Sequence, residues 1–283
     1  MKRILLAAIA MSTSMLSLAQ TDTTKREKID TIKVGGMIII KKSDGDGHDT
    51  IRNRNRTITI SNNRNNVKRT NSNLRTNWWI VDLGFSNFND KTNYAAAQAS
   101  GFVAPGVGED QLELRTGKSV NVNIWFFMQR LNMVKNVVNL KYGLGLELNN
   151  YRFDDERVYF QENPTRIVLN EDYKGAKKNK LAADYVTVPV MLNLNFTPGR
   201  KNGFLVSGGV SAGYLYSSRQ KFKVGDNKDK NHDDFDLRKW KLAYIGELGL
   251  GPVRLYGSYA MKSMWEKGLD QTPYNVGIRI SSF

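Results

Sequence analysis

The sequence predicts an eight-stranded antiparallel transmembrane β-barrel, and three observations lead to this fold class. From Asn77 onward, apolar and polar residues alternate through eight segments, each near the ~9–11 residues that a tilted membrane-spanning strand needs. The connections between these segments alternate between long and short. The chain opens with an export signal and ends inside an alternating segment at Phe283, as a closing barrel strand would.

Residues 1–19 are predicted to be a secretory signal peptide. Lys2 and Arg3 precede an apolar stretch, and Ser17-Leu-Ala19 offers small residues for cleavage, so the mature chain is expected to begin at Gln20. After the signal, no apolar run approaches the ~18–20 residues of a spanning helix. A membrane-spanning form must then be a closed barrel, because lipid leaves no other way to satisfy the backbone. The absence of cysteine excludes disulfides, a cysteine nucleophile and thiolate metal sites.

Residues 20–75 form a polar, basic region with 13 Lys and Arg against 6 acidic residues. Short β-prone pieces at 31–34, 37–40 and 57–60 are too few to bury a core. We therefore expect a largely disordered periplasmic tail or a loose hairpin, the alternative being that these pieces pair with a partner protein. The net charge of +15 would favour nucleic acid in a cytosolic protein, but export argues against that partner.

The eight predicted strands begin with four that have a clear outward face. The outward positions in these four are Trp79, Val81, Leu83 and Phe85; Val120, Val122, Ile124, Phe126 and Met128; every second residue from Val138 to Leu148; and every second residue from Val186 to Phe196. The remaining strands are expected at 204–218, 237–250, 253–264 and 272–280. Together they define a barrel domain over residues 76–283.

The predicted connections have the asymmetry of an outer-membrane barrel. Long segments at 89–116, 154–180 and 221–236 alternate with short ones at 131–136, 197–203 and 251–252. Aromatic residues gather near both strand ends, which suggests two interfacial girdles: Trp79, Phe196 and Phe204 at the turn side, and Tyr214, Tyr216, Trp240 and Tyr274 at the loop side. A soluble β-sandwich or lipocalin-like barrel with the apolar face inside remains the alternative, because alternation alone fits both.

A resemblance to a known family begins at Tyr185–Phe196, which reads YVTVPVMLNLNF. Outer-membrane β-barrel proteins of the Bacteroidota, the PorT-like group, often carry a strand of this form followed by a turn. Phe204–Leu215 resembles the family's glycine-rich next strand, and Asn77–Gly84 resembles its first strand. The resemblance covers roughly residues 77–283 and implies an outer-membrane barrel. Most relatives have no assigned activity, and one branch is implicated in type IX secretion and gliding.

Charged residues at the inward positions are the candidate site residues. They are Asp82, Lys141, Glu147, Arg219, Lys241, Glu247, Arg254, Lys262 and Arg279. A small barrel leaves a lumen scarcely wide enough for side chains, and buried charges are costly unless they are paired. We expect a lumen charge network that fills the barrel, which argues against an open pore. A proton or ion path is the alternative.

One motif of the chain matches a catalytic pattern. Gly209–Gly213 fits the G-x-S-x-G nucleophile elbow, which requires a sharp strand-to-helix turn. Here strand-like sequence continues on both sides. The chain has only two histidines, His48 and His232, and neither falls on a predicted strand that would bring a base to Ser211. We expect no catalytic residue.

Two acidic segments are candidate metal sites. Asp44–Asp49 begins like a calcium loop but lacks glycine at the sixth position and has Asn55 in place of a carboxylate at the twelfth. Asp226–Asp236 is interpreted as a solvated loop tip rather than a surface cation site. We therefore expect no metal and no cofactor.

These observations favour a non-enzymatic outer-membrane protein with a structural or accessory role. Membrane lipid surrounds it, and a periplasmic or outer-membrane protein partner would bind residues 20–75 or the external loops. One alternative is a small outer-membrane lipid-modifying enzyme, which needs a polar catalytic cluster at the outer rim. The other is a narrow channel.

Overall fold

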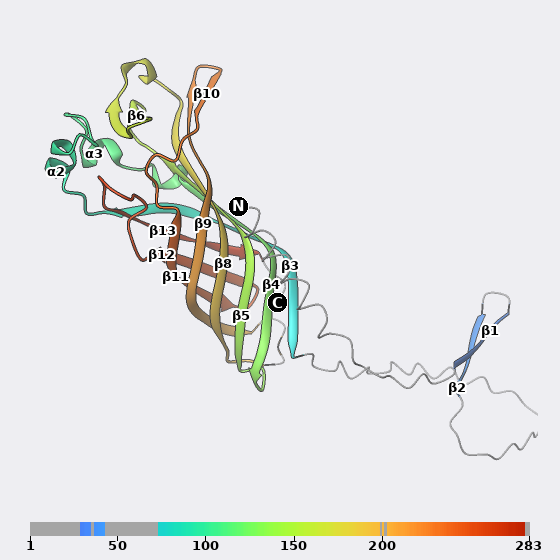
Figure 1. Ribbon diagram of the computed structural model, residues 1–283. Coiled ribbons are helices and arrows are strands. Elements are labelled where there is room, and N and C mark those ends of the chain that lie inside the picture. The colour runs from blue at the N-terminus through green and yellow to red at the C-terminus, as the bar shows by residue number, and fades with distance from the viewer. Residues whose placement is uncertain (1–28, 35–36, 43–72, 199, 201–202, 281–283) are drawn as a thin grey trace, which may run out of the picture. The chain divides into compact units, whose positions relative to one another are not determined.

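The computed structural model describes residues 29–34, 37–42, 73–198, 200 and 203–280 (Figure 1). The chain divides into two compact units, Met1–Asn65 and Asn66–Phe283. The predicted signal peptide and most of the predicted tail lie outside the described residues. The described part of the first unit is a hairpin, in which β1 (Ile29–Val34) pairs antiparallel with β2 (Met37–Lys42). A loose hairpin was one of the two forms expected for the tail, and these two strands form one.

The second unit is an eight-stranded antiparallel β-barrel (Figure 1). Its strands are β3 (Leu74–Asp90), β4 (Val120–Val134), β5 (Val138–Arg152), β8 (Lys178–Asn195), β9 (Phe204–Val224), β11 (Trp240–Leu250), β12 (Val253–Ala260) and β13 (Gln271–Ile280). Each strand pairs with its neighbour in chain order, and β13 returns to pair with β3. Closure pairs each of these eight strands with a neighbour on both sides. The predicted fold class is confirmed, with the first strand beginning two residues earlier than expected.

The predicted outward face is correct along most strands. On β3, Leu83 and Phe85 are about half exposed, whereas Asp82 and Ser86 on the opposite face have no exposed surface. Met128 was predicted to point outward and is fully buried. The reason is a register shift between Trp125 and Phe127, which inserts one residue into β4 and reverses its faces beyond that point. A bulge of one residue thus decides the side on which the end of β4 places its side chains.

The seam where β13 meets β3 depends on a pair of glycines. Gly84 and Gly277 lie opposite each other, and a Cβ on Gly277 would come within 2.5 Å of the Gly84 Cα. The same added atom would lie 2.7 Å from the Tyr256 ring, which occupies the space above the pair. The missing side chains let an aromatic ring reach the backbone in the narrow lumen.

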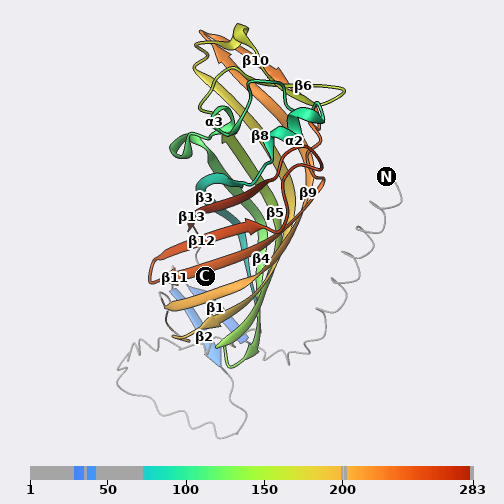
Figure 2. The ribbon, with the colours of Figure 1, turned by 90° about the vertical axis from the view of Figure 1, so that its left-hand side faces the viewer.

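The long connections are folded rather than simple loops, and they gather at one end of the barrel (Figure 2). They contain α2 (Tyr94–Ala99), α3 (Glu109–Leu112), the 3-10 turns η1 (Thr116–Lys118) and η2 (Glu171–Tyr173), and the strands β6 (Val158–Gln161), β7 (Arg166–Leu169) and β10 (Asn227–Asn231). β6 pairs with β7, and β10 extends β9. We call this assembly, together with the connections 232–239 and 261–270, the loop cap.

The outer surface of the barrel is apolar between two sets of aromatic residues. Trp79, Phe196 and Phe204 are exposed toward the short turns, and Tyr214, Tyr216 and Trp240 are exposed toward the cap. Tyr214 and Trp240 pack edge to face with ring centroids 5.0 Å apart. Among the described residues, no helix has the length and apolar character needed to cross a membrane. Six of the seven predicted girdle residues are therefore exposed on the outside, and Tyr274, the seventh, is half-buried.

Candidate functional site

A bidentate ion pair lies inside the barrel at the closing seam. Arg279 on β13 donates from Nε and Nη2 to the two carboxylate oxygens of Asp82 on β3, at 2.7 and 2.8 Å. Asp82 also accepts a hydrogen bond from Trp125 Nε1 at 2.7 Å. The two charged residues are direct cross-strand partners, so strand register alone brings them together. Paired, planar contacts of this kind are the strongest ionic hydrogen bonds in proteins.

Glu247 on β11 carries the network across the lumen. Its Oε2 accepts hydrogen bonds from Arg279 Nη1 at 2.9 Å and from Lys141 Nζ at 2.5 Å. Arg254 Nη1 lies 3.6 Å from the other oxygen. Because Lys141 is on β5, which is not a neighbour of β11, this contact spans the interior. Three cations around one buried carboxylate compensate for its removal from water.

A second cluster centres on Glu147. Its carboxylate pairs with Lys241, and its Oε1 accepts from Asn275 Nδ2 at 3.0 Å and from Asn149 Nδ2 at 3.2 Å. The Lys241 ammonium also sits 5.4 Å from the centre of the Tyr185 ring. The Glu147 carboxylate is therefore satisfied by one cation, Lys241, and by amides from two strands.

Asparagine side chains connect the two clusters. Asn121 Nδ2 donates to Asn149 Oδ1 at 2.9 Å and to Asn123 Oδ1 at 3.0 Å. Asn123 Nδ2 in turn donates to Asp82 at 3.2 Å. These amides were not predicted as site residues. The available signal was asparagine at inward positions of adjacent strands.

Side chains fill this layer of the lumen almost completely. The cavity among Trp125, Glu147 and Arg279 measures about 30 Å³, room for about one water molecule. The charges and amides thus form a plug made by the strands themselves, which we call the lumen plug.

Seven of the predicted lumen residues meet in the plug: Asp82, Lys141, Glu147, Lys241, Glu247, Arg254 and Arg279. Arg219 was predicted to belong to it and lies elsewhere. The β8–β9 pairing skips Tyr216, so Arg219 faces outward and pairs with Asp184 at 2.5 Å. Lys262, also predicted inward, is exposed in the segment after β12.

The loop cap has its own apolar core above the plug. Its buried members include Phe102, Val103, Leu112, Phe160, Ile167, Phe235 and Trp265, which pack on Tyr151, Leu181, Tyr185 and Leu215 from the barrel strands. Phe160 stacks on Trp265 with centroids 5.6 Å apart, and Phe102 meets the same indole edge to face at 5.9 Å. The cap therefore covers the mouth of the barrel as a packed layer. The alternation along the strands did not predict this apolar core.

Hydrogen bonds tie the cap to the barrel rim. Trp265 Nε1 donates to Gln271 Oε1 at 2.9 Å, and Gln271 Nε2 donates to Asp90 Oδ2 at 2.7 Å. The Tyr94 hydroxyl donates to the same carboxylate at 2.6 Å. Burial, together with this contact, raises the pKa of Tyr94 far above its usual value. A neutral tyrosine is thus fixed between α2 and the end of β3.

Two further cap residues have shifted pKa values. Hydrogen bonds from Arg157 hold the pKa of Asp155 below its usual range. Burial raises the pKa of Tyr173 to about 12, helped by its hydrogen bond to Asp229. Both shifts describe fixed contacts within the cap.

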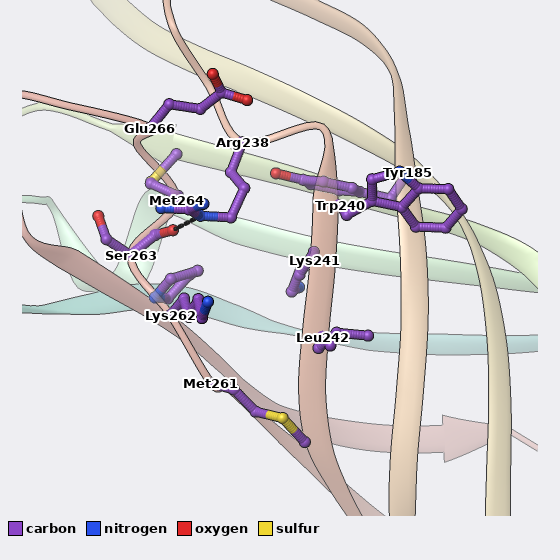
Figure 3. A pocket seen from close by; sticks show the side chains of 11 residues that line it. Tyr185, Arg238, Trp240, Lys241, Leu242, Met261, Lys262, Ser263, Met264 and Glu266 are labelled. Atoms are coloured by element: carbon purple, nitrogen blue, oxygen red, sulfur yellow. Dashed lines mark hydrogen bonds between the residues drawn. The ribbon is translucent and has the colours of Figure 1, made fainter.

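A lateral pocket of about 320 Å³ opens in the wall beside β11 (Figure 3). The Met261 backbone N–H donates to the Leu242 carbonyl, and the Arg238 backbone N–H donates to the Met264 carbonyl. Between these two contacts, the backbone hydrogen bonds that join β11 to the chain around the end of β12 are interrupted. Exposed apolar side chains border the pocket, and the lumen residues Tyr185 and Lys241 also line it. The one serine in its lining, Ser263, donates to Leu269 O and accepts from the backbone of Trp265 and Gln271.

The structure also shows where the G-x-S-x-G motif lies. Ser211 lies in the middle of β9, opposite Pro189 and Ala243, so the chain does not form the strand-to-helix turn of a nucleophile elbow there. The segment Asp44–Asp49 lies outside the described residues. Within the described ranges, no group of three or more potential ligands is placed to hold a metal ion.

The barrel, its apolar belt and its charged interior agree with the comparison to known families. Residues 58–261 match the model described as outer membrane protein beta-barrel domain. The chain belongs to this family. No curated protein matches the sequence. As a member of the family, it is an outer-membrane protein, and the apolar outer face of the barrel is therefore the surface that meets lipid.

Proposed function

We propose that this outer-membrane barrel is a non-enzymatic structural or accessory protein that engages a protein partner through its loop cap or its N-terminal tail. The observation that carries the proposal is the closure of the barrel by two layers, the lumen plug and the apolar core of the cap. A barrel used for passive transport needs a polar path, whereas this interior is filled. A folded cap instead offers a preformed surface for binding, at little cost in ordering.

The proposed orientation places the cap outside the cell and the tail in the periplasm. Short turns at one end and long connections at the other are the arrangement of bacterial outer-membrane barrels, whose long loops are external. An even strand number puts both ends of the barrel chain at the short-turn side. The PorT-like resemblance, with its Bacteroidota origin and its branch linked to secretion, suggests an assembly role for a periplasmic tail.

The test is a mild-detergent pull-down from native outer membranes. Three baits are compared: the mature chain, a chain lacking residues 21–72, and a chain in which exposed cap side chains Glu109, Asp110 and Glu162 are replaced by alanine. A stoichiometric partner lost with one change assigns the binding surface. A lone monomer with all three baits contradicts the proposal.

A conductance measurement addresses the channel alternative separately. We expect the purified protein to insert into a planar bilayer without stepwise current. Regular unitary current steps that appear with the mature protein and disappear when it is denatured would show that it is a channel. They would contradict the proposed accessory role. The lipid-modifying alternative has a pocket beside β11, but the hydroxyl of its one lining serine is engaged with backbone groups.

A further inference from the structure

Cations stand directly opposite one another on the outer surface where β5, β8, β9 and β10 reach the cap. One row runs across four strands through Arg152, Lys180, Lys221 and Lys230. The next row runs across three strands through Lys178, Lys223 and Lys228. Paired residues of an antiparallel sheet project from the same face, so each row brings its charges together. We call the two the basic rows.

The basic rows are on the outside of the wall rather than in the lumen. Lys178 and Lys180 have the same parity on β8 as the lipid-facing Val186 and Val188. On β9 the residue skipped at Tyr216 brings Lys221 and Lys223 to that same face. The alternate positions, such as Gln220 and Phe222, are buried against the cap.

Like charges placed opposite each other destabilise a sheet, and little in the protein offsets them here. Asp184 on the same face attracts Lys180 and Lys221, but its carboxylate already pairs with Arg219. Within the described residues, no member of the two rows makes an ion pair. Arg152 donates to the Lys177 carbonyl and Lys180 to the Asn150 amide, both neutral acceptors.

The strands beneath the rows are held firmly. Phe222, on the inner side of β9, stacks on Tyr173 with centroids 3.8 Å apart and on Tyr159 at 5.8 Å. The Tyr173 hydroxyl donates to Asp229 on β10 at 2.9 Å. Figure 1 shows β9 and β10 rising together at the cap end. The lysine and arginine side chains of the basic rows are therefore attached to an ordered sheet, and the strands that carry them cannot easily move apart.

The height of the rows matches the headgroup region of a bilayer. Lys221 lies five residues beyond Tyr216, the last exposed aromatic on β9, which is about 16 Å along the strand and about 12 Å along the membrane normal for a tilted barrel. The apolar belt thus continues into a cationic belt at the level where lipids carry their charged groups.

We propose that the basic rows bind the phosphate groups of an anionic lipid in the leaflet at the cap end of the barrel. The lipid's chains would lie on the apolar face of β8 and β9, and its phosphates would bridge the opposed ammonium groups of Lys180, Lys221 and Lys230. The proposal does not depend on the protein partner proposed above, because it concerns lipid on the barrel wall.

The test compares thermal unfolding of the purified mature protein in micelles that contain phosphorylated lipid A or the same lipid with its phosphates removed. We expect the phosphorylated lipid to raise the midpoint by at least ~3 °C at low salt, and added salt to reduce that shift. In the triple variant Lys180→Gln, Lys221→Gln, Lys230→Gln, the shift should fall below a third of its normal size. Without lipid, the same variant should melt no lower than the unchanged protein, because it removes repulsion.

A control with the same charge change is Lys91→Gln, Lys239→Gln, Lys262→Gln, which alters exposed lysines at the same end of the barrel. It should keep the full shift. An equal midpoint in both lipids, or an equal shift in both triple variants, would overturn the proposal. Inorganic phosphate at matched phosphorus concentration should have little effect; if it reproduces the whole shift, the rows bind free anions and the assignment to lipid is wrong.

Discussion

The barrel interior and the loop cap are both filled, but their side chains do so by opposite chemistry. In the lumen plug, the carboxylates of Asp82 and Glu247 are satisfied by hydrogen bonds from cationic side chains and from amides. In the cap, rings such as Phe160 and Trp265 exclude water without any charge. The difference follows from what surrounds each region. A spanning strand must put its apolar side chains toward lipid, which leaves polar residues for the inside, whereas the cap faces water and can keep its apolar residues within.

The largest effect is expected from Glu247→Ala in the lumen plug. Removing this carboxylate leaves Lys141 and Arg279 buried beside each other without it, which should cost about 3–5 kcal/mol of unfolding free energy. The denaturant midpoint of the barrel refolded in lipid vesicles, followed by tryptophan fluorescence, measures the loss. Glu266→Ala, at an exposed cap position, is the control. A loss below 1 kcal/mol would mean that the plug is not a stabilising unit.

Phe160→Ala should be nearly as damaging but local. The ring is fully buried among Phe153, Phe235 and Trp265, and its loss should cost about 3–5 kcal/mol. Because the barrel ladder is independent of these contacts, we expect protease cleavage within residues 91–119 and 153–177 while the barrel core stays intact. Glu162→Ala is the matched surface change. If the whole barrel unfolds with the cap, the two regions are one cooperative unit.

Tyr94→Phe tests the connection between the two regions. It removes the hydrogen bond to Asp90 while keeping the ring, and should destabilise the cap by about 1–2 kcal/mol. Combining it with Gln271→Ala, which removes the other side-chain hydrogen bond to Asp90 Oδ2, gives a double-mutant cycle. Energies that simply add would show that the two contacts to Asp90 act separately.

The smallest effect concerns pH and should be confined to the cap. Since the pKa of Asp155 is lowered in the folded state, its contact with Arg157 contributes stability above the unfolded pKa of about 3.9 and is lost as pH falls through the lower folded value. The pair is partly exposed, so solvent screening should keep the contribution small. Amide hydrogen exchange in residues 153–171, compared between pH 5 and pH 3, should show a loss of protection that Asp155→Asn already has at pH 5.

The sequence by itself determined the barrel and most of its inward charges. The period of two along each strand places Asp82, Lys141 and Glu247 on the polar face. Strands of this length in a membrane leave closure as the way to satisfy the backbone. Such information is local, so it can be found in ten consecutive residues.

Tertiary structure decided what local period cannot specify. The inserted residues at Phe126 and Tyr216 reversed the face of Met128 and moved Arg219 out of the lumen, because a bulge depends on the partner strand. The joining of Lys141 to Glu247 across the lumen, the apolar core of the cap and the alignment of Lys180 with Lys221 all depend on strand register and on contacts between distant segments. The lumen plug and the cap support the proposed accessory role, and the basic rows support the proposed lipid site. Each of them forms only when separate strands lie side by side.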